Sequence, residues 1–156
     1  MKETINFHIK FDSMFWDLPP MARISVNDQI KFDGAIDRSE FIVTFDETLD
    51  FDRVHTLYIN RYNKLPGQCI VLDDGRLQDQ VLILQQLKID GIDVQSLINT
   101  ISYNRPEYPE PWATEQRSNG VELEETVLAE TWFGHNGTWS LTFTSPFYKF
   151  LYKNIG

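Results

Sequence analysis

The residues best suited to binding lie in a proline-rich, aromatic insertion from Tyr103 to Gly120. Its three prolines fix the backbone and withhold hydrogen-bond donors, so the segment is predicted to be a stiff loop outside the interior of a sheet. Rigid aromatic side chains at Tyr103, Tyr108 and Trp112 are suited to stacking on sugar rings or to anchoring an interface at low entropic cost. The alternative is that Tyr108 and Trp112 fold inward and cap one end of the core.

A second aromatic segment surrounds His135, between Phe133 and Trp139. It makes His135 and Trp139 further candidates for contact with a ligand or a protein partner. We expect His135 to hydrogen-bond across its own turn rather than to act as a general base. The other two histidines, His8 and His55, have no second histidine at ligand spacing, so the pattern gives little support to a zinc site.

An acidic cluster at Asp73, Asp74 and Asp79 is a weak candidate for calcium, because hard cations prefer several carboxylate oxygens. Its spacing does not follow the alternating ligands of an EF-hand loop. The alternative is a solvated turn, and the same holds for the acidic residues between positions 46 and 52.

Signals for catalysis are weak throughout the chain. No serine stands in a nucleophile-elbow setting, glycine-rich phosphate loops are absent, and Cys69 has no evident basic neighbour in the sequence. We therefore predict a protein that is not an enzyme and has no cofactor.

Strand-period alternation supplies the elements that would carry these residues. Alternating apolar and polar residues predict a strand that begins almost at the first residue, and the apolar segment Val81–Leu87 predicts a central strand. The pair Asp90-Gly91 is the preferred two-residue hairpin turn. Further hairpins are expected around Asn27-Asp28 and between residues 131–133 and 139–143. Helical turns are expected at 96–101 and after Ser145-Pro146.

Together these elements predict an all-β fold with one domain over residues 1–156. The expected architecture is a two-sheet β-sandwich of jelly-roll or Greek-key kind, with the long proline and aromatic loop and a short C-terminal helix.

Composition limits the partners. The chain has 156 residues, a net charge of −9 and an aromatic content of 13%. A polyanion would be repelled, which argues against direct contact with nucleic acid or an anionic membrane. The single cysteine permits no intrachain disulfide and suits a reducing cytoplasm. The N-terminus reads as a strand rather than a signal peptide, and no apolar run reaches the roughly 20 residues that span a bilayer.

Two blocks of sequence carry a resemblance to a known group. They are the run Tyr108–Gln116, preceded by Ile89-Asp90-Gly91-Ile92 and by Tyr103, and the run Glu130–Trp139, followed by Phe143–Tyr148. These blocks resemble small accessory structural proteins of tailed marine and cyanobacterial bacteriophages. The predicted sandwich is also similar to carbohydrate-binding modules, a likeness of architecture rather than of a ligand motif.

The resemblance implies a non-enzymatic virion structural protein that is made in the host cytoplasm and decorates the phage head. It would dock on the capsid lattice through aromatic loops and sheet edges, and a homo-oligomer is a further option. The alternatives are a tail or baseplate component, and a carbohydrate-binding module that attaches a particle to glycans.

Overall fold

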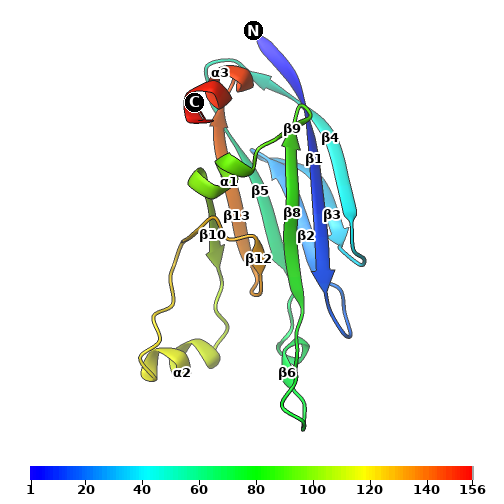
Figure 1. The fold of residues 1–156 in the computed structure, drawn as a ribbon, viewed down its shortest axis with the longest axis vertical. Coiled ribbons are helices and arrows are strands. Elements are labelled where there is room, and N and C mark those ends of the chain that lie inside the picture. Colours follow the sequence, from blue (N-terminus) through cyan, green and yellow to red (C-terminus); the bar gives the residue numbers. More distant parts are fainter. Residues whose placement is uncertain (156) are drawn as a thin grey trace.

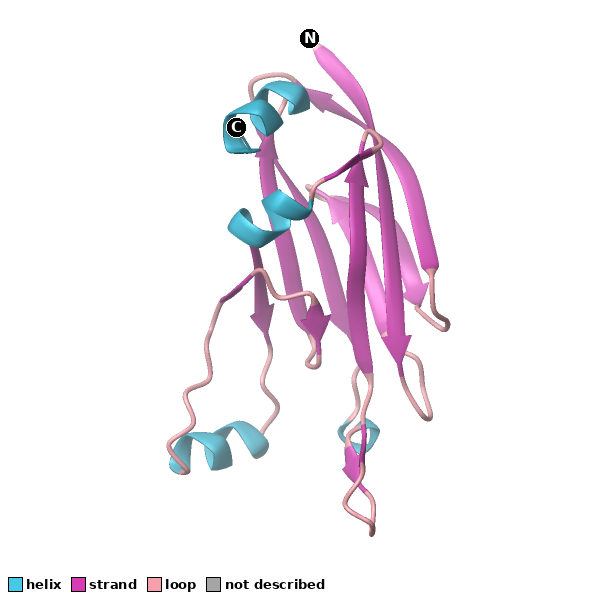
Figure 2. Cartoon of the chain, viewed as in Figure 1, coloured by secondary structure: helices cyan, strands magenta, loops and turns pink. Residues whose placement is uncertain are grey.

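The computed structural model describes residues 1–155 and forms a sandwich of two antiparallel sheets, with three short α-helices among the described residues (Figures 1 and 2). The first sheet has the order β12-β8-β1-β4, with β9 paired to β8. Its strands are β1 (Lys2–Met14), β4 (Phe41–Asp50), β8 (Val81–Ile89), β9 (Ile92–Asp93) and β12 (Trp132–Phe133).

The second sheet has six strands in the order β11-β10-β13-β5-β2-β3. They are β2 (Met21–Val26), β3 (Gln29–Ala35), β5 (Val54–Tyr62), β10 (Ser102–Pro106), β11 (Val127–Leu128) and β13 (Gly137–Thr144). The predicted β-sandwich is therefore confirmed. A small hairpin of β6 (Ile70–Val71) and β7 (Leu77–Gln78), preceded by the 3-10 turn η1 (Pro66–Gln68), extends from one end (Figure 1).

The core lies between the two sheets because alternate residues of each strand point inward. In β1 the residues Ile5, Phe7, Ile9 and Phe11 are buried, as their alternation predicts. The ring of Phe7 lies 6.3 Å from that of Phe143 on β13, so the two sheets meet directly across the interior.

Local turn chemistry sets the register of two hairpins. Asp90 and Gly91 both have positive φ, 50° and 76°, and join β8 to β9 as predicted. Asn27, with a φ of 55°, turns β2 into β3. Its side-chain oxygen accepts a hydrogen bond from the Thr56 N–H, which ties this turn to β5.

One predicted hairpin is wrong. The segment Trp132–Phe133 does not fold back on β13; it pairs with β8 in the opposite sheet, and β13 pairs with β10 and β5. Phe133 and Trp139 are both buried between the sheets, so the residues between them carry the chain from one sheet to the other.

The insertion is more regular than predicted. Its first residues belong to β10, which lies between β11 and β13, and a later part forms helix α2 (Trp112–Ser118). The prediction that the whole segment stays outside the sheet is wrong because its prolines fall at or after Pro106, the last residue of the strand, where they interrupt no ladder.

The other two helices confirm the predictions made for them. Helix α1 (Gln95–Ile101) follows β9, and helix α3 (Phe147–Ile155) follows Ser145-Pro146. The carboxylate of Glu3 on β1 accepts hydrogen bonds from the Ser145 hydroxyl and from the Phe147 N–H, and so caps the start of α3. Within residues 1–155 no helix has the length and apolar character needed to cross a bilayer.

Candidate functional site

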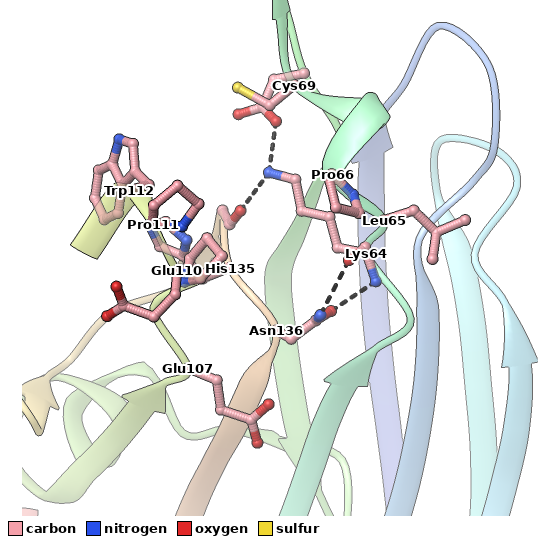
Figure 3. Close-up of a pocket in the computed structure, with 13 residues that line it drawn as sticks. Lys64, Leu65, Pro66, Cys69, Glu107, Glu110, Pro111, Trp112, His135 and Asn136 are labelled. Atoms are coloured by element: carbon pink, nitrogen blue, oxygen red, sulfur yellow. Dashed lines mark hydrogen bonds and ion pairs between the residues drawn. The ribbon is translucent and has the colours of Figure 1, made fainter. Parts of the chain in front are cut away.

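A cavity of about 460 Å³ opens at the end of the sandwich where β5 and β10 finish and β13 begins. This end lies opposite α3 in Figure 1. Most of its lining residues come from three stretches far apart in the sequence: residues 64–66 and 69 after β5, residues 107 and 109–112 from the end of β10 to the start of α2, and residues 134–136 before β13. Asp79 completes the lining, and Figure 3 shows the stretches converging on one cavity.

Three aromatic rings form a cluster at the cavity. Tyr108 and Trp112 stack with ring centroids 6.2 Å apart, and His135 lies 5.2 Å from each of them. The Tyr108 hydroxyl donates a 2.6 Å hydrogen bond to the carbonyl of Glu124, which fixes the tyrosine. Trp112 keeps 37% of its surface exposed and lines the cavity, so its ring is available to a ligand.

Lys64 supplies a positive charge at the opposite wall. Its ammonium donates hydrogen bonds of 2.6 Å to the Asp79 carboxylate and 2.6 Å to the Gly134 carbonyl. The Lys64 side chain is only 13% exposed. The ion pair is therefore a fixed part of the wall rather than a freely moving surface contact.

Asn136 holds the three lining stretches together. The backbone N–H of Lys64 donates to Asn136 Oδ1 at 2.8 Å, and Asn136 Nδ2 donates to the Lys64 carbonyl at 3.3 Å. The Asn136 carbonyl in turn accepts from the Glu107 N–H at 2.7 Å. Asn136 thus fixes the stretch that carries Lys64 relative to the stretch that begins at Glu107 and carries Tyr108 and Trp112.

Gly137, the first residue of β13, allows the backbone of β10 to approach β13 closely. A Cβ atom at this position would lie 2.5 Å from the carbonyl oxygen of Arg105 and 2.9 Å from the Cα of Pro106. Both atoms belong to the backbone of β10, so they cannot move aside as a flexible side chain would. Glycine is required here because the two backbones meet at van der Waals distance.

Burial shifts the pKa of two titratable side chains that line the cavity, His135 and Cys69. Burial lowers the pKa of His135, and the positive charges of Lys64 and Arg61 lower it further, so the imidazole is neutral at neutral pH. Burial raises the pKa of the Cys69 thiol, with a further rise from Asp79, so the thiol is not activated as a nucleophile.

Asp79 stays ionised despite its position. Burial acts to raise its pKa, but the hydrogen bonds from Lys64 and the Gln80 N–H, together with the lysine charge, outweigh it and lower the pKa. Arg61 is buried, does not line the cavity and donates to the Gln80 carbonyl at 2.7 Å; burial lowers its pKa to about 10. The lowered pKa of Asp79 keeps its carboxylate ionised at neutral pH beside the Lys64 ammonium.

The predicted site residues do not all lie together. Tyr108, Trp112 and His135 form the aromatic cluster described above, in which Trp112 and His135 line the cavity and Tyr108 packs against both of them. Tyr103 is 44% exposed on β10 but does not line the cavity. Trp139 is completely buried in the core, so the proposal that it stacks on a ligand or a partner is wrong: its inward position on β13 places it between the sheets.

Lys64, Asn136 and the Gly134 carbonyl were not predicted. Each comes from a connection between strands, and nothing in the local sequence distinguishes Lys64 from other surface lysines. Only the pairing of β5 with β13 brings Lys64 beside residues 134–136.

The acidic candidates for calcium are not gathered into one site. The carboxylate of Asp74 pairs with Arg76 at 2.6 Å, and that of Asp79 pairs with Lys64. Within residues 1–155 no group of three or more His, Cys, Asp or Glu side chains is placed to hold a metal ion.

No family model and no curated protein sequence matches the chain. Two solved structures are similar to it. One is the selenomethionine form of vCBM60, described with circular permutation as a link between two families of calcium-dependent carbohydrate-binding modules. It has a TM-score of 0.50, 9% identity, and coverage of 88% of this chain and 89% of that one. The other is vCBM60 in complex with galactobiose, with a TM-score of 0.51, 10% identity, and coverage of 87% and 96% respectively.

At this level of identity the likeness shows the fold: the chain has the β-sandwich of a carbohydrate-binding module. The calcium dependence described for that group does not fit the residues found here. Two of the three calcium candidates, Asp74 and Asp79, each form an ion pair with a cationic side chain. A divalent ion would have to displace a bound ammonium or guanidinium group at either position.

Proposed function

We propose that this chain is a non-catalytic glycan-binding module and that its ligand occupies the cavity beside Trp112. The observation that carries the proposal is the exposed indole of Trp112, held in a fixed cluster with Tyr108 and His135 at the mouth of a preformed cavity.

Carbohydrates suit this arrangement for a physical reason. A sugar ring has an apolar face of C–H groups that packs on an aromatic ring, and a polar rim of hydroxyls that needs hydrogen-bond partners. The cavity offers both. Trp112 and three prolines, Pro66, Pro109 and Pro111, give rigid apolar surface, and Lys64, Asp79 and Asn136 give polar groups. Little conformational entropy is lost on binding because both walls are already held in place.

The fold supports the same proposal. The two similar structures are of a carbohydrate-binding module, and one of them contains galactobiose. A neutral disaccharide is therefore the first ligand to test.

The test is isothermal titration calorimetry with a panel of neutral and acidic oligosaccharides that includes galactobiose. We expect saturable binding to at least one neutral member, lost in the Trp112→Ala variant. Trp132→Ala is the matched control, because Trp132 is 57% exposed but lies on β12 and does not line the cavity. The absence of binding to every glycan, or an equal loss in both variants, would refute the proposal.

The virion role predicted from sequence remains a separate prediction. The aromatic cluster would suit a protein interface as well as a sugar, but no structural finding points to a capsid or tail lattice. Mass spectrometry of purified particles would test it, and a particle without the protein would eliminate it.

A further inference from the structure

We propose that the ammonium of Lys64 is the polar anchor of the glycan site, donating to a sugar hydroxyl, and that binding requires no calcium. This inference rests on the proposed function and deepens it. It names the residue that would provide the polar contact and the class of glycan that the cavity accepts.

The geometry of Lys64 leaves a donor free. An ammonium group has three N–H donors in a tetrahedral arrangement. Two are used, by the Asp79 carboxylate and the Gly134 carbonyl, each at 2.6 Å (Figure 3). Within residues 1–155 the ammonium has no third acceptor, and Lys64 lines the cavity. A ligand hydroxyl in the cavity can accept the remaining N–H.

The anchor is already held in place before a ligand arrives. The Asp79 and Gly134 acceptors fix the end of the side chain, and the two hydrogen bonds with Asn136 fix its backbone. A flexible surface lysine would lose side-chain entropy on binding, whereas this one has already lost it on folding. Both acceptors that hold the ammonium are protein groups, the Asp79 carboxylate and the Gly134 carbonyl, so the position of the anchor does not depend on a bound metal ion.

The charge of the cavity indicates the class of glycan. Three carboxylates line it, those of Asp79, Glu107 and Glu110, against the single ammonium of Lys64. An acidic sugar would bring a further negative charge beside Glu107 and Glu110, whereas a neutral sugar would not. The cavity therefore selects neutral glycans over those that contain uronic acids or sulfate.

The experiment titrates the neutral oligosaccharide panel, galactobiose included, into the wild type and into the Lys64→Met variant, with calcium present and with EDTA. We expect Lys64→Met to lose about 10- to 100-fold in affinity, because that is what one hydrogen bond from a charged donor contributes. EDTA should leave wild-type affinity unchanged. Lys153→Met, at the opposite end of the molecule, is the control and should bind like the wild type.

Removing Lys64 alone leaves Asp79 without its partner and can weaken folding. The double variant Lys64→Met/Asp79→Leu removes both charges together, so that neither is left without its partner, and leaves no N–H donor in the side chain at position 64. Near-ultraviolet circular dichroism verifies that its tertiary structure is retained, and it should show the same loss of affinity.

The outcomes separate the two proposals. If the wild type binds no glycan, both fail. If the wild type binds a glycan and Trp112→Ala does not, the proposed function stands. In that case the anchor proposal alone is overturned by either of two results: normal binding by the lysine variants, or loss of wild-type binding in EDTA.

Discussion

Replacing Gly137 by alanine should lower stability because two strands meet too closely there to admit a side chain. The new Cβ would lie 2.5 Å from a backbone oxygen of β10 and 2.9 Å from a backbone carbon. Real Cβ atoms essentially never come within 3.0 Å of such neighbours, so β10 must move away from β13.

The size of the effect follows from two opposing terms. Overpacking costs about 1–3 kcal/mol, and the upper part of this range applies because the obstructing atoms are backbone. Alanine gains about 0.5–1 kcal/mol over glycine in chain entropy. The net loss is about 2 kcal/mol, which corresponds to a fall of about 4–8 °C in Tm for a chain of this size.

Gly134→Ala is the matched control. Gly134 lies three residues earlier, in the connection that leads into β13, and a Cβ atom there would meet nothing within 4 Å. Urea unfolding followed by tryptophan fluorescence gives both free energies of unfolding. We expect Gly134→Ala to remain within about 0.5–1 kcal/mol of the wild type. If the two variants unfold at the same urea concentration, the close approach of β10 to β13 is not a determinant of stability and the reasoning fails.

Three other predictions test the core, a helix cap and the electrostatics of the cavity. Trp139→Ala should lower the free energy of unfolding by about 3–5 kcal/mol, measured by thermal or urea unfolding, because Trp139 is fully buried. Trp132→Ala, at an exposed position, should lower it by less than about 1 kcal/mol, and comparable losses in the two variants would contradict the placement of Trp139. Glu3→Ala should cost about 1 kcal/mol through loss of the cap on α3, and Glu122→Ala in an exposed loop should change little, so equal effects would remove the capping role. The pKa of His135 is lowered in the folded protein, so as the pH falls the unfolded chain binds a proton at this residue before the folded protein does. The free energy of unfolding is therefore unaffected by His135 protonation at pH 7.5 and decreases as the pH drops through the ordinary histidine pKa. His135→Gln should therefore lose less stability than the wild type between pH 7.5 and 5.5, and an identical loss would show that another group is responsible.

The sequence was sufficient for features that local chemistry determines. Alternation identified β1 with its inward residues Ile5 and Phe7, the Asp90-Gly91 pair identified a hairpin, and Ser145-Pro146 marked the start of α3. It was insufficient where the partner lies far along the chain. The strand at Trp132 pairs with β8 because of the way both sheets close over the core, which no local pattern records.

The candidate site shows the same division. Tyr108, Trp112 and His135 could be identified as aromatic candidates from their own segments, and the structure brings them together. Lys64 could not be identified, since its role depends on Asp79 and Gly134, fifteen and seventy residues away. Trp139 was misjudged because a strand presents alternate residues to opposite faces, and sequence alone did not establish which face was the interior.

The most direct test of glycan binding at this cavity uses the indole N–H signals of the four tryptophans, Trp16, Trp112, Trp132 and Trp139, in a ¹H–¹⁵N NMR titration. The titrant is the neutral oligosaccharide that binds most tightly in calorimetry, and single Trp→Phe variants assign the signals. The Trp112 signal should shift most and reach saturation, while those of Trp132 and the buried Trp139 stay in place. A saturable shift at Trp132 with Trp112 unmoved, or no shift at any indole, would contradict the account.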